Sequence, residues 1–204
     1  MHLIIKEQSD LNEQEMEDIL EADYISIDTE TTGLDFLNHD LCTIQLYSTN
    51  YSIIIRYSKT VHYENLIKIL TSKNIIKVFH NAFFDCSFLM HNLGIVINNV
   101  VCTKISAKII NGINADNSLK GLLFKYLGVK IDKSQQLSDW TSKNLSQEQI
   151  NYAMNDVLYL HELWLCLESE LVKYDLINTA KNCFEYIPTY VMLIEKGIKN
   201  IFEY

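Results

Sequence analysis

The sequence contains little proline or glycine, and its cysteines form no recognisable pairs. Its 204 residues include one proline, six glycines and five cysteines. The cysteines are odd in number and scattered, without a C-x-x-C pair, so we expect buried thiols in a reducing compartment and neither a disulfide framework nor a zinc site. Hydrophobic residues make up 48% of the chain and charged residues 21%, which excludes a disordered chain.

Long apolar runs and a signal-peptide pattern are also missing. No run approaches the ~18 residues of a membrane-spanning helix, and acidic sequence follows the first residues. We therefore expect a cytoplasmic protein. The length predicts a single domain over residues 1–204.

Basic residues are few. The chain has 17 Lys and Arg against 26 Asp and Glu, for a net charge of −9. This balance argues against a broad electrostatic grip on long nucleic acid, which needs many contacts from cations to phosphates. A short anionic substrate held through metal ions remains compatible with it.

The hydrophobic periodicity predicts an α/β fold with a mixed sheet. Residue patterns indicate strands at 2–6, 24–30, 41–47, 51–56, 75–79 and 100–102, with 41–56 forming a hairpin. Helices are expected at 64–70, 82–93, 103–110 and 118–127, and in a short segment that Asp10 and Glu13 would cap. Gly94 is expected to end the helix 82–93, and Gly128 the helix 118–127. A capping box at Ser146 and Gln149 predicts a long helix reaching residue 173, and the last helical stretch is expected to be interrupted near Pro188.

Two acids lie at the end of the predicted strand 24–30. Asp28 and Glu30 point to the same side, because successive strand side chains alternate between faces. Two like charges beside a buried strand are unfavourable unless a cation lies between them. An alternative interpretation is a solvated acidic turn made with Gly33.

Two further acids lie on predicted helices. Asp85 shares a mostly apolar helix face with Phe88 and Leu89, which directs it towards the sheet; the alternative is a favourable contact with the helix dipole. Asp156 follows Tyr152 by four residues, so their side chains are neighbours. A buried Tyr–Asp hydrogen bond alone would explain that pair.

The four carboxylates together favour a metal centre. Hard oxygen ligands in this number suit Mg²⁺ or Mn²⁺. Two such ions about 3.5–4 Å apart can stabilise the attacking and leaving oxygens of a phosphodiester hydrolysis. Tyr152, with a reference pKa near 10, would be neutral and would orient the attacking water.

The motifs DTETTGL, HNAFFD and YAMND, in this order, resemble those of the DEDDy 3′–5′ exonucleases, the branch that includes ribonuclease D. The resemblance implies an RNase H-like fold with a five-stranded mixed sheet. It also implies metal ligation by Asp28, Glu30, Asp85 and Asp156, and the water-orienting role for Tyr152.

A narrower resemblance, over nearly the whole chain, is to the nanoRNase C family. The segments KSQQLSDW and Cys102-Thr103-Lys104 contribute to it. It implies hydrolysis of very short RNA, mainly dinucleotides, by a homo-oligomer that is an octamer in that family. It places Leu34 against the bases, although a core leucine would fit the sequence equally well.

The remaining candidate contacts are less specific. His80 is a candidate for a ribose or phosphate contact or for a helix cap, and Gln136 is a further candidate substrate contact. Trp140 is expected to fix a loop to the core, the alternative being stacking on a base.

Three hypotheses follow for function. The first is a metal-dependent 3′–5′ exoribonuclease acting on diribonucleotides, and the second is the same chemistry on longer RNA or DNA ends, as in ribonuclease D. The third is a catalytically inactive binding module, which the presence of all four acids and Tyr152 disfavours.

Overall fold

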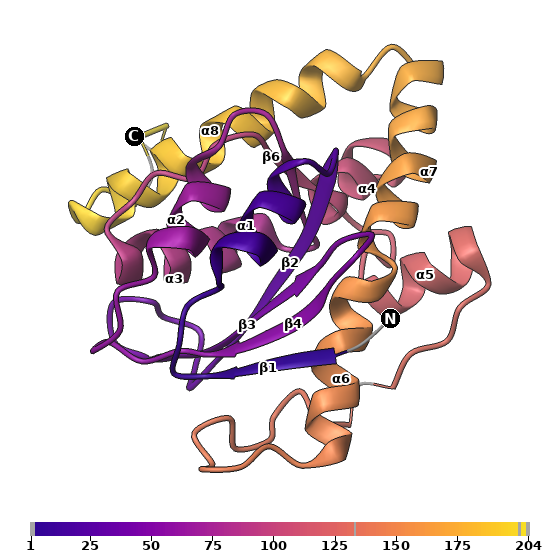
Figure 1. Ribbon diagram of the computed structural model, residues 1–204. Coiled ribbons are helices and arrows are strands. Elements are labelled where there is room, and N and C mark those ends of the chain that lie inside the picture. Colours follow the sequence, from indigo (N-terminus) through magenta and orange to yellow (C-terminus); the bar gives the residue numbers. More distant parts are fainter. Residues whose placement is uncertain (1–2, 133, 200, 203–204) are drawn as a thin grey trace.

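A six-stranded mixed sheet forms the centre of the protein in the computed structural model, which describes residues 3–132, 134–199 and 201–202 (Figure 1). Within these residues the strand order is β1-β4-β3-β2-β5-β6. The strands are β1 (Leu3–Glu7), β2 (Tyr24–Thr31), β3 (Leu41–Tyr47), β4 (Ser52–Arg56), β5 (Ile76–Phe79) and β6 (Val100–Cys102).

The central strand β2 runs antiparallel to β3 and parallel to β5. The β3–β4 pair is the predicted hairpin, and β1 adds in parallel to the outer side of β4. The sheet has six strands where the family resemblance implies five, because β1 pairs along its whole length with β4. The predicted strand 2–6 is thereby confirmed from Leu3 onwards, and its first residue, His2, lies outside the described residues.

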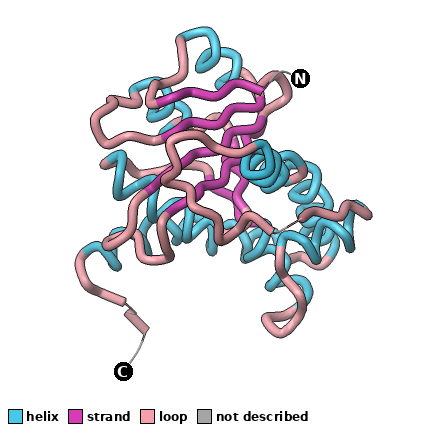
Figure 2. Tube along the Cα trace, turned by 90° about the horizontal axis from the view of Figure 1, so that it is seen from below, coloured by secondary structure: helices cyan, strands magenta, loops and turns pink. Residues whose placement is uncertain are grey.

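Eight helices pack around this sheet in the described part of the chain (Figure 2). They are α1 (Glu13–Leu20), α2 (Glu64–Thr71), α3 (Ala82–Leu93), α4 (Thr103–Asn111), α5 (Leu119–Leu127), α6 (Gln147–Leu158), α7 (Leu160–Lys173) and α8 (Ile177–Glu195). None of the described helices is long and apolar enough to cross a membrane.

Several predicted helix ends are confirmed. Helix α3 ends at Gly94 and α5 at Gly128, both in the left-handed conformation that glycine adopts without penalty. The Ser146–Gln149 capping box begins α6 as predicted.

Three expectations about helices were wrong. The predicted helix from Ser146 to residue 173 is two helices, because Tyr159 leaves the helical conformation at φ −109° and ψ 3°. Helix α8 continues through Pro188 without interruption. The capping box of α1 is formed by Asn12 with Glu15, while the Asp10 carboxylate accepts backbone N–H groups at the start of α2.

The hydrophobic interior has two parts. The larger one joins the sheet to most of the helices and includes the buried face of α7, with Leu163, Trp164 and Leu167. A smaller cluster lies under α6 and comprises Cys42, Ile54, Trp140, Tyr152 and Ala153. Helix α6 is therefore held against β2, β3 and β4 by a set of side chains separate from those that hold α7.

Candidate active site

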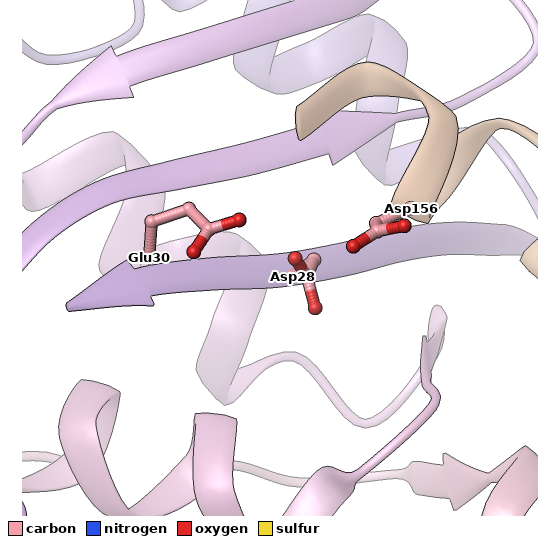
Figure 3. A group of neighbouring side chains, drawn as sticks. All are labelled: Asp28, Glu30 and Asp156. Atoms are coloured by element: carbon pink, nitrogen blue, oxygen red, sulfur yellow. The ribbon is translucent and has the colours of Figure 1, made fainter. Parts of the chain in front are cut away.

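The end of β2 forms the floor of an acidic pocket. Asp28 and Glu30 leave the strand on one face, as the alternation of strand side chains predicts, and Asp156 of α6 reaches them from above (Figure 3). One carboxylate oxygen from each of the three residues lies within 4.8 Å of the other two. This convergence joins residues that are more than 120 positions apart in the sequence.

Asp85 enters the same pocket from α3. Its carboxylate is 1% exposed and accepts a 2.7 Å hydrogen bond from the Thr29 hydroxyl. Thr29 lies between Asp28 and Glu30, so its side chain leaves β2 on the opposite face. In the described part of the chain, Asp85 is not one of the three residues whose carboxylate oxygens lie within 4.8 Å of one another, but it lines the same pocket.

Burial alters the proton affinity of two groups in the pocket. Burial raises the pKa of Asp85 from 3.8 to about 7, and the charge of Asp156 adds to this while the Thr29 hydrogen bond opposes it. Burial, followed by the charges of Asp156, Glu30 and Asp28, raises the pKa of Tyr152 far above its usual value of 10.0. Tyr152 is thus a neutral hydroxyl donor beside three carboxylates.

The donor set fits a hard divalent cation. Carboxylate oxygens at this spacing repel one another, and a cation between them would remove both the repulsion and the cost of burying their charge. Asp28, Glu30 and Asp156 could hold such a cation between them, and Asp85 lines the same pocket.

The candidate substrate contacts line the same cavity, which has a volume of about 670 Å³. Leu34 follows the β2 turn and is 85% exposed, so it is not a core residue. His80 is held by a 2.9 Å hydrogen bond between its Nδ1 and the Thr103 hydroxyl. Gln136 lies on the lining segment between α5 and α6. Trp140 is buried against Tyr152 with ring centroids 6.0 Å apart, as expected for a residue that fixes a loop.

The turn that carries Leu34 depends on a close approach at Gly33. A side-chain carbon at this position would overlap the ring of His39, which packs on the glycine. The His39 Nδ1 also lies within hydrogen-bond distance of the backbone N–H and carbonyl of Asp35. A side chain at position 33 therefore fits only if the exposed His39 ring moves aside.

Sequence reasoning missed two contributors to the site. Thr29 supports Asp85, and its place between two acids on a strand was the available signal. Lys104 contributed to the family resemblance without being given a role, and it brings a positive charge to the pocket lining from the first turn of α4.

The fold and the acidic pocket are those of an RNase H-like 3′–5′ exonuclease. The 3′–5′ exonuclease family matches residues 3–172, and the chain belongs to this family. It is 31% identical to ribonuclease D of Bartonella henselae over 153 residues, which cover 74% of this chain but 37% of the relative. The chain thus spans well under half the length of this curated relative.

Particular solved structures match over the whole chain. The protein is similar to NrnC of Brucella melitensis bound to pGG, with 34% identity, a TM-score of 0.90, and coverage of 100% of this chain and 99% of the other. The same nuclease with bound Mg²⁺ matches with 32% identity, a TM-score of 0.89 and full coverage of both chains. These findings confirm the predicted resemblance.

Proposed function

We propose that this exonuclease hydrolyses very short RNA, mainly diribonucleotides, to nucleoside 5′-monophosphates with the help of two divalent ions, Mg²⁺ or Mn²⁺. The observation that carries the proposal is the convergence of Asp28, Glu30 and Asp156 within 4.8 Å, with the neutral Tyr152 beside them. This arrangement combines a cation site with a hydroxyl group that can orient water.

Each residue has a distinct task in this proposal. Asp28, Glu30 and Asp156 hold the ions, and Asp85 completes the set from α3. Bound ions supply positive charge to the phosphate and to the attacking and leaving oxygens. Tyr152 orients the attacking water through its hydroxyl group and does not act as a strong base, because its raised pKa keeps it protonated.

The substrate class rests on similarity and on the residues that line the pocket. The full-length structural relative was solved with the dinucleotide pGG. In this proposal Leu34, which is 85% exposed and lines the pocket, contacts a base. His80 contacts the ribose or phosphate, and Gln136 is a further substrate contact; both line the same pocket. Three further predictions accompany this proposal. The protein forms a homo-oligomer, octameric as in the nanoRNase C family; it is cytoplasmic; and residues 1–204 form a single domain.

The metal assignment is tested by removing single carboxylates. Asp28→Ala and Asp156→Asn should each abolish hydrolysis in Mg²⁺ or Mn²⁺ and weaken Mn²⁺ binding measured by calorimetry, while circular dichroism stays that of the wild type. Glu17→Gln, which neutralises an exposed acid on α1, is the matched control. Full activity in either site variant would remove the assignment.

A second candidate is the same chemistry on longer RNA or DNA ends. The 31% identity to ribonuclease D favours it. Hydrolysis rates on substrates of two, five and twenty nucleotides separate the two: the diribonuclease proposal requires a steep fall with length. Nucleotide binding without hydrolysis at any length would instead indicate an inactive binding module.

A further inference from the structure

Leu137 is an apolar side chain displayed almost entirely to solvent. It is 97% exposed and lies in the irregular segment between α5 and α6. Its neighbours Gln136, Ser138 and Asp139 are polar, and all four residues line the acidic pocket. Leu34, on a separate segment of the lining, is the other strongly exposed leucine of this pocket.

The turn that carries Leu137 is firmly attached to the rest of the protein. The Ser138 N–H donates to the Gln135 carbonyl over 3.0 Å. The Gln149 amide donates to the Ser138 hydroxyl over 3.1 Å and to the Asp139 carbonyl over 3.0 Å. Gln149 is 6% exposed and is itself fixed by the capping box of α6.

Two further contacts hold the chain just after the turn. Trp140 is 3% exposed and packs on Tyr152. The Arg56 guanidinium of β4 donates to the Ser142 carbonyl over 2.6 Å. The segment is thus tied both to α6, which carries Tyr152 and Asp156, and to the sheet.

The apolar side chain of a leucine on such a turn is exposed to water, which is unfavourable. Its position beside the pocket is fixed by the contacts of the turn. An apolar ligand surface can cover it with little ordering of the loop, and this lowers the entropic cost of binding. The faces of nucleobases provide such a surface, and enzymes hold single bases between aromatic or apolar side chains.

We propose that Leu137 is a specificity-determining contact for one base of the substrate, on a second segment of the pocket lining distinct from that of Leu34. The inference rests on the proposed function, because it takes a nucleotide as the ligand. Leu137 is a binding residue and takes no part in the chemical step.

The test compares Leu137→Ala with the conservative Leu137→Met on a diribonucleotide. Leu137→Ala should raise KM about tenfold and leave kcat within about twofold, since a lost apolar contact away from the reacting phosphate weakens ground-state and transition-state binding equally. Leu137→Met should stay close to the wild type. Ile113→Ala is the control, because Ile113 is 78% exposed but does not line the pocket.

Two dinucleotides, each with one base removed, identify the contacted base. The difference between wild type and Leu137→Ala should vanish on one of them and persist on the other. Equilibrium binding of a fluorescent dinucleotide in chelator should show the same tenfold loss without turnover. An unchanged KM, or an effect that persists on both base-free substrates, overturns the proposal.

The remaining outcomes separate this inference from its premise. A change in molecular mass by light scattering with an unchanged KM would assign Leu137 to a contact between copies and overturn the proposal. A wild-type protein that cleaves longer RNA but not dinucleotides, with Leu137→Ala still raising KM, would overturn the substrate class alone.

Discussion

The buried carboxyl of Asp85 makes the stability of the metal-free protein depend on pH. Its folded-state pKa is raised to about 7 from 3.8, chiefly by burial. A carboxyl group with a higher pKa in the folded state than in the unfolded state stabilises the folded state most at pH values below its unfolded-state pKa. This stabilisation is lost as the pH rises to its folded-state pKa. The contribution of Asp85 to the free energy of unfolding should therefore fall as the pH rises from about 4 to about 7.

The magnitude follows from the same numbers. A pKa raised from 3.8 to about 7 corresponds to up to about 4 kcal/mol at pH values above 7, at 1.36 kcal/mol per pKa unit. Asp85→Asn removes this titration and keeps an oxygen that can accept the Thr29 hydrogen bond. In the presence of chelator the variant should be more stable than the wild type above pH 7, and the advantage should vanish near pH 4.

Urea denaturation between pH 4 and pH 8 in chelator measures this difference, with Glu17→Gln as the control for an exposed acid. Adding Mn²⁺ should raise the free energy of unfolding of the wild type much more than that of Asp85→Asn, because a nearby cation favours the charged carboxylate. A variant whose advantage does not change with pH, or that is less stable than the wild type at pH 8 without metal, would refute a buried carboxyl with a raised pKa.

Two further predictions concern the groups around the catalytic strand. Thr29→Val keeps the shape of the residue but removes the 2.7 Å hydrogen bond to Asp85, so kcat and the Mn²⁺ affinity measured by calorimetry should fall about 10- to 100-fold. Thr29→Ser keeps the hydroxyl group and should restore both values. Equal values for the Val and Ser variants would contradict a role of the hydroxyl group in supporting Asp85. Gly33→Ala should collide with the His39 ring, displace the turn of Leu34 and raise KM for a dinucleotide. The double variant with His39→Ala should recover most of this loss, whereas additive effects in the double-mutant cycle would show that the two residues are not coupled.

Most of the secondary structure and the acidic residues of the site could be predicted from the sequence. Strand alternation placed Asp28 and Glu30 on one side of β2, and helical periodicity turned Asp85 and Asp156 inward, as their 1% and 6% exposures confirm. Local signals with a direct backbone cause, such as Gly94, Gly128 and the Ser146 capping box, located helix ends correctly.

The errors arose where tertiary contacts decide the outcome. The break at Tyr159 leaves the hydrophobic periodicity intact, so the pattern cannot show it. Pro188 is tolerated within α8 because Phe184, Ile187 and Val191 around it are buried and hold the helix in place. The hydrogen bond from Thr29 to Asp85 joins two segments that are 56 residues apart, and the local pattern of neither segment predicts this contact.

The break at Tyr159 has a consequence for how the enzyme can change. Helix α6, which carries Tyr152 and Asp156, packs through its own small cluster and through Gln149, whereas α7 packs in the main hydrophobic core. The two helices are therefore held by different sets of contacts. Amide hydrogens of α6 should accordingly exchange with solvent through partial openings that leave α7 closed. Variation can thus reshape the reactive end of the molecule without loosening the framework that keeps it folded.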